Sequence, residues 1–129
     1  MAIHHILIVD DSPTERFYLT DILVRAGFAV TTAVNGGEAI DKIRAERPQL
    51  ILMDVVMPGA NGFQVTRSIA RDPELAAIPV IICSSKNQET DRIWGMRQGA
   101  RDYLVKPVDP ALLLASIASL DQQPASAAA

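Results

Sequence analysis

Short apolar runs alternate along this chain with longer segments in which apolar residues recur every three or four positions. The runs at 6–9, 50–54 and 79–83 are apolar almost throughout, which is typical of strands that are covered on both faces. Two less uniform runs continue the same alternation. Together the pattern predicts strands at 6–9, 29–33, 50–54, 79–83 and 103–105, each separated from the next by a helical segment.

The first three helical segments carry clear start and stop signals. Ser12-Pro13-Thr14-Glu15 combines a capping box with a proline at the first helical position, and Gly27 ends that helix. A second helix begins at Asn35 and stops before Pro48. A third is predicted over 62–71.

The last two helices differ in strength. The helix over 87–98 is the weakest in the chain, because Gly95 in its interior costs about 1 kcal/mol relative to alanine. The final helix begins at Asp109-Pro110, and its apolar face is predicted to carry Leu112, Leu113 and Ile117.

Strict alternation of strands and helices predicts an α/β fold with a doubly wound, five-stranded parallel sheet and helices on both faces. The length fits one domain, predicted at 1–121, with no internal repeat and no linker. Residues 122–129 are rich in alanine, serine and glutamine, and we expect them to form a disordered, low-complexity tail.

Charge and composition exclude several kinds of partner. The formal net charge of −3 argues against nucleic acid or an anionic membrane as the main partner. No apolar run approaches the length of a membrane span. The single cysteine, Cys83, leaves no internal disulfide and lies in an apolar run, so we expect a core residue rather than a nucleophile. These features fit a cytoplasmic protein.

Polar side chains stand at the ends of four predicted strands. Asp10 and Asp11 follow the first strand, Asp54 ends the third, Ser84 follows the fourth and Lys106 follows the fifth. The carboxyl ends of parallel strands open on one edge, where doubly wound folds bind ligands, so these groups can converge. Singly, each has an ordinary explanation as a helix-terminal acid, a helix cap or a turn. Jointly, a shared site explains them better.

The residue types at these strand ends indicate phosphoryl transfer. Three neighbouring carboxylates repel one another, and Lys106 compensates only one of the charges. Mg²⁺, which takes carboxylates, waters and a phosphate oxygen, would compensate the rest. Lys106 and the hydroxyl of Ser84 would then be donors to an oxyanion. Asp54 lies centrally and can itself be the nucleophile, which would give an acyl phosphate.

With these residues in place, the chain resembles a known family, the CheY-like receiver domains of bacterial two-component response regulators. The resemblance covers residues 6–117, nearly the whole chain. It implies a flavodoxin-like fold and a single-domain response regulator that accepts a phosphoryl group from a histidine kinase. The motifs that carry it are Ile8-Val9-Asp10-Asp11, residues 52–59 with Gly62, Ser84, and Lys106-Pro107.

The resemblance also implies a role for each residue at the acidic strand ends. Asp54 would be the phospho-acceptor. Asp11, Asp54 and the carbonyl of Val56 would bind Mg²⁺ directly, and Asp10 would act through a water. Lys106 would contact the phosphoryl group.

By the same resemblance, phosphorylation would move a switch. Ser84 would approach the phosphoryl group after transfer, and the side-chain rotamer of Tyr103 would follow. The Lys106-Pro107 peptide bond is expected to be cis. We expect the helix over 87–98 to be the element that changes position, and the face that partners contact to include Trp94, Met96 and Tyr103.

A narrower resemblance concerns the pathway. Residues 86–103 are similar to the stand-alone PilH-type receivers of twitching-motility and chemotaxis-like pathways. This similarity implies a CheA-like histidine kinase as the phosphoryl donor and a downstream protein as the target, or a role as a phosphate sink. We expect the protein to act as a monomer.

Two positions depart from the family's pattern. Many receivers carry a polar residue two places after the acceptor, where this chain has Val56, and Lys86 stands two places after Ser84. Both positions flank the path of an attacking water. They are therefore expected to alter the lifetime of the phosphoryl group.

Three other functions are compared with this one. A Mg²⁺-dependent aspartyl-phosphate phosphatase also uses a strand-end aspartate, but it needs Asp-x-Asp after the first strand, where Asp10 and Asp11 are adjacent. Turnover of nitrophenyl phosphate would identify it. A flavodoxin-like cofactor carrier is disfavoured because the chain has no Gly-rich phosphate loop. A docking module that is never phosphorylated would not need the acids, the hydroxyl and the lysine together.

Overall fold

The five apolar runs form one parallel sheet in the order β2-β1-β3-β4-β5. The computed structural model describes residues 2–122, so the predicted tail at 122–129 lies, apart from Gln122, outside the described residues. All five predicted strands are confirmed, with bounds that shift by one residue at most. They span His5–Val9 (β1), Ala29–Ala33 (β2), Leu50–Met53 (β3), Val80–Ser84 (β4) and Asp102–Val105 (β5).

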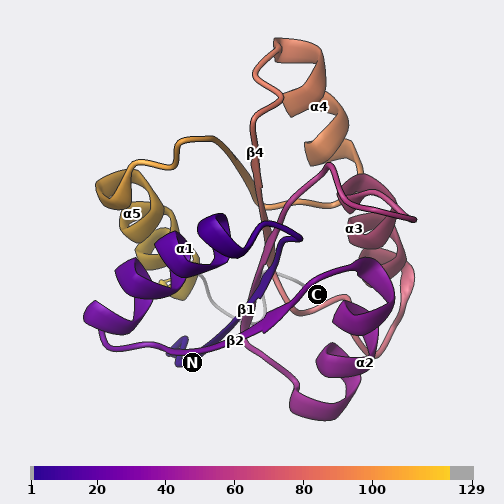
Figure 1. The fold of residues 1–129 in the computed structure, drawn as a ribbon. Helices are drawn as coiled ribbons and strands as arrows, with labels where there is room; N and C mark the ends of the chain where they lie inside the picture. Colours follow the sequence, from indigo (N-terminus) through magenta and orange to yellow (C-terminus); the bar gives the residue numbers. More distant parts are fainter. Residues whose placement is uncertain (1, 123–129) are drawn as a thin grey trace.

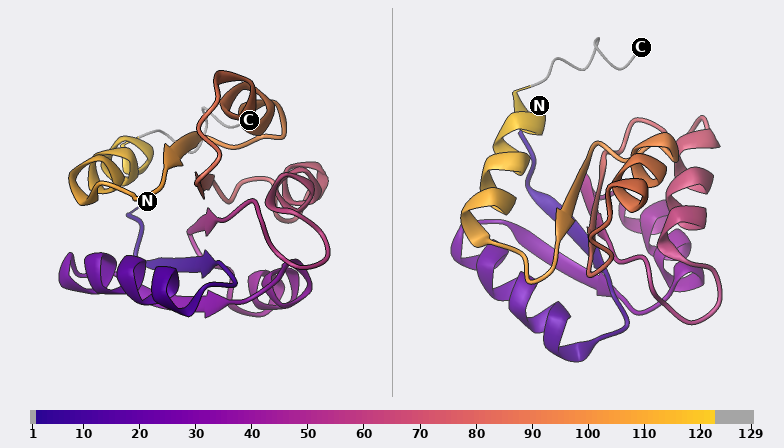
Figure 2. Two further views of the ribbon diagram at one scale, coloured as in Figure 1. Left: turned by 45° about the horizontal axis from the view of Figure 1, so that its top comes forward. Right: turned by 90° about the horizontal axis from the view of Figure 1, so that it is seen from above.

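The helices cover both faces of this sheet. Figure 1 shows α1 and α5 on one face and α2, α3 and α4 on the other, and the turned views of Figure 2 keep the two layers apart. The predicted doubly wound α/β fold is therefore confirmed. Within residues 2–122 no helix is long and apolar enough to span a membrane. The helices span Pro13–Arg25 (α1), Gly36–Glu46 (α2), Gly62–Arg71 (α3), Glu89–Arg97 (α4) and Pro110–Asp121 (α5).

Each uniformly apolar strand contributes to two separate cores. Successive side chains on a strand point to opposite faces of the sheet. Leu7 and Val9 of β1 therefore pack into the core beneath α2 and α3, whereas Ile6 and Ile8 pack into the core beneath α1 and α5. β3 and β4 divide their side chains in the same way. This two-sided burial is why these runs lack the polar alternation of a half-exposed strand.

The predicted capping box at the start of α1 is half correct. Ser12 Oγ accepts a hydrogen bond from the Glu15 N–H at 3.2 Å, as a cap should. The second half of the prediction is wrong, because the Ser12 N–H donates to Asp10 Oδ1 at 2.9 Å rather than to Glu15. The carboxylate of Asp10, at the end of β1, therefore takes the place of Glu15 as acceptor for the Ser12 N–H. Within residues 2–122, Glu15 Oε1 is consequently buried without a hydrogen-bond partner.

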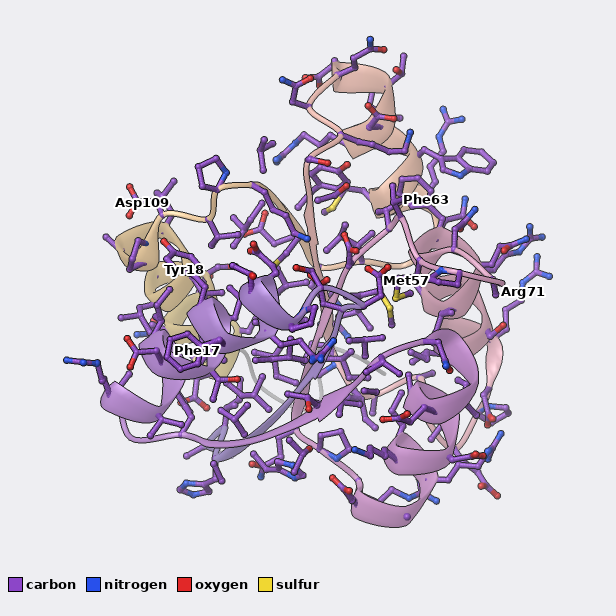
Figure 3. The ribbon with its side chains drawn as sticks, in the orientation of Figure 1. Phe17, Tyr18, Met57, Phe63, Arg71 and Asp109 are labelled. Atoms are coloured by element: carbon purple, nitrogen blue, oxygen red, sulfur yellow. The ribbon has the colours of Figure 1, made fainter. Side chains whose placement is uncertain are left out.

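The buried face of α5 is narrower than predicted. Leu113 and Ile117, four positions apart, are buried against the sheet. Leu112 is 60% exposed, so its assignment to the apolar face is wrong: one residue along a helix turns the side chain by about 100°. Across the same layer, Tyr18 of α1 donates its hydroxyl proton to the Val108 carbonyl at 2.7 Å, which ties α1 to the segment before α5 (Figure 3).

The loop after β3 returns so closely that only glycine fits where α3 begins. The Gly62 N–H donates to the Val55 carbonyl at 2.9 Å. A Cβ atom at Gly62 would lie 1.9 Å from the carbonyl oxygen of Asp54. Asn61 caps the helix through a complete capping box with Gln64. The start of α3 is thus held against the end of β3, next to Asp54.

Gly62→Ala is expected to lower the free energy of unfolding by about 1–3 kcal/mol or more, because the clashing atom belongs to the backbone and cannot rotate away. Gly37→Ala is the matched control: its Cβ would meet only Asn35 Oδ1, at 3.6 Å. At that helical position alanine should be neutral or stabilising by up to about 1 kcal/mol. Urea unfolding measures both variants. Equal stability of the two would contradict the close approach at Gly62.

Candidate functional site

The predicted polar groups converge at the carboxyl edge of the sheet. β1 and β3 are neighbours in the sheet, yet the helix that follows β1 lies on one face and the helix that follows β3 lies on the other (Figure 1). Doubly wound folds bind ligands where two such neighbouring connections diverge. Asp10 and Asp11 follow β1 and Asp54 follows β3, so all three acids lie at this point.

One ammonium group lies between two buried carboxylates. Lys106 Nζ donates to Asp10 Oδ2 at 2.8 Å and to Asp54 Oδ1 at 3.2 Å. Asp10 is 1% exposed and Asp54 is 6% exposed. One positive charge is thus shared by two acids, so Lys106 compensates a single negative charge, as expected. Because all three groups are largely removed from water, loss of Lys106 would leave two carboxylates without a counter-charge, whereas loss of one acid would leave a neutral ion pair.

Backbone hydrogen bonds extend the sheet to these side chains. The Asp10 N–H donates to the Ala33 carbonyl at 3.0 Å, and the Asp54 N–H donates to the Val9 carbonyl at 2.9 Å. The Lys106 N–H donates to the carbonyl of Ser84 at 2.8 Å. Each functional residue is thus fixed by the neighbouring strand rather than by its own loop. The Lys106-Pro107 peptide bond is cis, as predicted.

The charges of the site shift one another's pKa values. Burial and the negative charge of Asp10 raise the pKa of Asp54 above its ordinary value, although Lys106 acts in the opposite direction. Burial alone would lower the pKa of Lys106, but hydrogen bonding and attraction to Asp10 and Asp54 outweigh it and raise this pKa. Lys106 is therefore fully charged at neutral pH. The ionised carboxylate of Asp54, in contrast, costs the folded state free energy.

The acidic cluster, which we define as Asp10, Asp11 and Asp54, fits a divalent cation. Each acid offers a carboxylate oxygen, and these oxygens lie within 4.8 Å of one another. Asp11 is exposed, so the cluster opens to solvent on that side. Against three carboxylates stands the single ammonium of Lys106, which leaves an excess of two negative charges. Hard oxygen donors with uncompensated negative charge suit Mg²⁺. The side chain of Val56, which follows the cluster, is 60% exposed.

Ser84 and Tyr103 are joined through the loop that leads into α4. Ser84 is fully buried, and its Oγ accepts a hydrogen bond from the Lys86 N–H at 3.1 Å. The hydroxyl of Tyr103 donates to the carbonyl of the same Lys86 at 2.8 Å. Burial raises the pKa of the Tyr103 phenol. A displacement of Ser84 would thus alter the residue to which Tyr103 is bonded.

The predicted partner face is exposed only in part. Trp94 is 49% exposed and Met96 is 38% exposed, as expected for a surface that a protein could contact. Tyr103 is only 4% exposed, so in this conformation its side chain is not accessible to a partner at this face. Its ring lies beneath α4, where a Cβ on Gly95 would come within 3.0 Å of it. The missing side chain of Gly95 makes room for the buried tyrosine.

Sequence reasoning missed Arg16 as a residue that shapes the site. Its Nη1 donates to the backbone carbonyl of Asp10 at 2.8 Å and thereby holds the end of β1 from α1. Helical spacing could have placed Arg16 on the first turns of α1. It could not have shown that the guanidinium returns to the strand that precedes the helix.

Comparisons with known proteins agree with this geometry. The model of the response regulator receiver domain family matches residues 6–118. Protein PilH of Pseudomonas aeruginosa is 58% identical over 112 residues, which are 87% of this chain and 93% of PilH.

Solved structures of similar chains share the fold. The chemotaxis protein CheY4 of Vibrio cholerae has a TM-score of 0.84 at 30% identity, covering 92% of this chain and 98% of its own. A Chloroflexus aurantiacus protein assigned as a response regulator has a TM-score of 0.90 at 30% identity, covering 94% and 99% respectively. The structural similarity therefore covers nearly the whole sheet and its helices.

Asp54→Asn is expected to stabilise the metal-free protein. Because the folded-state pKa of Asp54 lies above its ordinary value of 3.8, the free energy of unfolding falls as the pH rises above 3.8 and the group ionises. Asparagine keeps the shape of the side chain and removes its charge. In EDTA near neutral pH, the variant should melt at a higher temperature than the wild type, and the difference should shrink as the pH falls through that value.

Asp41→Asn, on the exposed side of α2, is the control for this experiment. Its effect should stay within about 0.5 kcal/mol at any pH, as for most surface substitutions. A lower melting temperature for Asp54→Asn than for the wild type in EDTA would show that Lys106 outweighs burial and Asp10.

Proposed function

The chain belongs to the response regulator receiver domain family, and on that premise we propose that it is the phospho-accepting module of a two-component phosphorelay, with Asp54 as the acceptor and a histidine kinase as the donor. The observation that carries the proposal is the position of the Asp54 carboxylate, 3.2 Å from Lys106 Nζ and within the acidic cluster. The protein is a signalling regulator rather than an enzyme that turns over a substrate.

In the forward step, a carboxylate oxygen of Asp54 attacks the phosphorus of a phosphohistidine. An O–P bond forms as the N–P bond breaks, and the released imidazole takes up a proton from solvent. Lys106, already beside Asp54, donates a hydrogen bond to a phosphoryl oxygen and offsets its charge. Placement and charge neutralisation of this kind supply most of the catalysis in phosphoryl transfer.

The excess negative charge of the acidic cluster supports a bound Mg²⁺. Asp11, Asp54 and the carbonyl of Val56 would hold the ion directly, and Asp10 would do so through a water. When bound, the ion supplies positive charge to the phosphoryl oxygens. The residues of the chain then align Asp54 with the donor and keep Lys106 in reach of the transferred group.

The reverse step is hydrolysis of the acyl phosphate. A water attacks the phosphorus, the O–P bond to Asp54 breaks, and inorganic phosphate leaves with the carboxylate restored. Val56 is exposed beside Asp54, and Lys86 is exposed after Ser84. Neither the apolar side chain of Val56 nor a lysine cation can accept a proton from this water. We therefore propose that the two residues set the lifetime of the phosphoryl group.

The signal would pass from Asp54 to α4 through the Ser84–Lys86–Tyr103 connection. A phosphoryl group brings up to about two negative charges and strong acceptor oxygens to one place. The hydroxyl of Ser84 would turn toward it and release the Lys86 N–H. Tyr103, bonded to the carbonyl of Lys86, would then lose or change its partner.

The weak anchoring of α4 supports this role. α4 is nine residues long, and Gly95 is its one buried residue. A helix with so little buried surface has a low free-energy cost of displacement. We propose that displacement of α4 changes which protein binds at Trp94 and Met96, or that the protein serves mainly as a phosphate sink.

For the pathway, we propose motility signalling of the twitching or chemotaxis type, in the cytoplasm, with a CheA-like kinase as donor and the protein acting as a monomer. The identity of 58% with PilH over 87% of the chain supports this assignment. Phosphotransfer from candidate kinases to the purified chain would identify the donor directly.

The acceptor is tested by incubating the protein with acetyl phosphate and Mg²⁺, followed by intact-protein mass spectrometry. The wild type should gain the mass of one phosphoryl group, and Asp54→Ala should gain none. Asp10, the other acid beside Lys106, is 1% exposed, and both of its carboxylate oxygens already accept hydrogen bonds, from the Ser12 N–H and from Lys106. Asp41→Ala, an exposed acid outside the site, should be labelled like the wild type. Labelling of Asp54→Ala to the same extent would refute the assignment.

Val56→Asn is expected to shorten the lifetime of the phosphoprotein by up to about tenfold. The asparagine amide can hydrogen-bond the attacking water, and one such bond is worth about 1 kcal/mol in the barrier. Val56→Leu, which stays apolar, should change the rate little. The decay of labelled phosphoprotein after removal of the donor measures all three proteins. An identical decay for Val56→Asn and wild type would exclude a role for this position.

A further inference from the structure

The groove between α3 and α4 is lined by side chains that have no role in phosphoryl transfer at Asp54. α3 and α4 lie on the same face of the sheet (Figures 1 and 2), and the groove between them has a volume of about 350 Å³. Pockets for small molecules measure about 300–1,000 Å³. We call it the α3–α4 groove; the residues with which it could recognise a ligand are Arg67, Arg71, Trp94, Arg97 and Gln98.

Three arginines without carboxylate partners line this groove. Arg67 and Arg71 stand four positions apart on α3, and Arg97 lies in the last turn of α4. Within residues 2–122 none of the three forms an ion pair, whereas Arg44 and Arg47 both pair with acids. Among the described residues, no carboxylate lines the groove. In a chain of net charge −3, this is a local concentration of uncompensated positive charge.

Arg71 extends from the outer side of α3, away from the sheet (Figure 3). Like charges four residues apart on a helix repel each other. The positive charges of Arg67 and Arg71 therefore destabilise the isolated helix. An anion bound in the groove would attract both guanidinium groups and offset their repulsion.

Two further side chains of the groove can contact a ligand. Trp94, the single tryptophan of the chain, is 49% exposed and offers a flat aromatic face beside the guanidinium groups. Gln98 is only 8% exposed, yet its side-chain amide makes no hydrogen bond to the rest of the described chain and lines the groove. The amide atoms keep contact with solvent, so a ligand in the groove can exchange hydrogen bonds with them in place of water.

At the base of the groove the two helices approach each other closely. Gly99 has a φ of +108°, and a Cβ there would lie 2.7 Å from the Cβ of Ala70. The end of α4 therefore touches α3 directly, without an intervening side chain. Ala70 and Gly99 thus lie side by side in the lining of the groove.

We propose that the α3–α4 groove binds a nucleoside di- or triphosphate. Guanidinium groups pair with phosphate oxygens through two parallel hydrogen bonds, and the three arginines match the charge of such a phosphate chain. The base stacks on the indole of Trp94, as bases do on aromatic side chains. The amide of Gln98, which both donates and accepts, pairs with the edge of the base.

The size and lining of the groove favour this ligand over an acidic peptide. A volume of about 350 Å³ is within the range of sites for one small molecule. A run of acidic side chains would also leave the aromatic face of Trp94 and the amide of Gln98 without suitable partners. Only a ligand that combines phosphates with a planar polar ring uses every group on the walls.

Trp94 itself reports binding, because it is the only tryptophan. Fluorescence of the full chain is titrated with ADP, ATP, GDP and GTP in EDTA and without a phosphoryl donor, so that the acidic cluster plays no part; calorimetry confirms the stoichiometry. We expect saturable quenching with one site per chain. Arg67→Gln with Arg71→Gln should weaken binding by at least about tenfold through two lost charged contacts.

Arg101→Gln with Arg92→Gln is the matched control, since it removes two positive charges outside the groove. Its affinity should stay within about twofold of the wild type, because the tenfold loss expected of the groove variant comes from direct contacts. Circular dichroism of each variant verifies folding. An equal loss in both double variants would reduce the effect to general electrostatics and overturn the proposal.

Two other probes decide what the groove recognises. Inorganic tripolyphosphate should bind more weakly than ATP, because it cannot stack on Trp94; equal affinity would overturn the nucleotide assignment. Polyglutamate should not compete. Binding of polyglutamate without binding of any nucleotide would identify a peptide-binding surface instead, and absence of any saturable signal would leave the groove without a ligand of this class.

Discussion

Two buried carboxylates that share one ammonium group are the arrangement on which the rest of this structure depends. Asp10 and Asp54 would repel each other at the edge of the sheet without Lys106, which reaches both at 2.8 and 3.2 Å. These residues come from the ends of β1, β3 and β5. A parallel sheet with short connections is what brings such distant positions to one edge. The pairing therefore both requires the fold and marks its functional side.

The arrangement provides a reactive carboxylate but lowers the stability of the folded state. Burial and the charge of Asp10 raise the pKa of Asp54, so an ionised nucleophile at this position weakens the folded state. Two hydrophobic cores, one on each face of the sheet, supply the compensating stability. Functional sites commonly carry a local cost of this kind. The excess negative charge of the acidic cluster also favours the binding of a cation, either alone or together with a phosphoryl group.

The two helical layers differ in how firmly they are held. On the α1–α5 side, the hydroxyl of Tyr18 ties α1 to the segment before α5. On the other side, α4 buries only Gly95 and rests on α3 through the contact of Gly99 with Ala70. The weakly held helix is the one that the Ser84–Lys86–Tyr103 connection reaches. It also forms one wall of the α3–α4 groove, so both proposed functions use the same element.

The sequence by itself determined the elements, their order and the edge at which the acids, the hydroxyl and the lysine meet. Periodicity and caps are local properties, and the rule that parallel strands open on one edge converts strand-end residues into a site. Tertiary structure alone decided three other features. The Ser12 N–H donates to Asp10 instead of Glu15, the ring of Tyr103 is buried beneath Gly95, and Leu112 faces solvent. Each of these outcomes depends on which distant atoms come within contact distance. Local patterns in a chain carry no information about such distances until the elements pack.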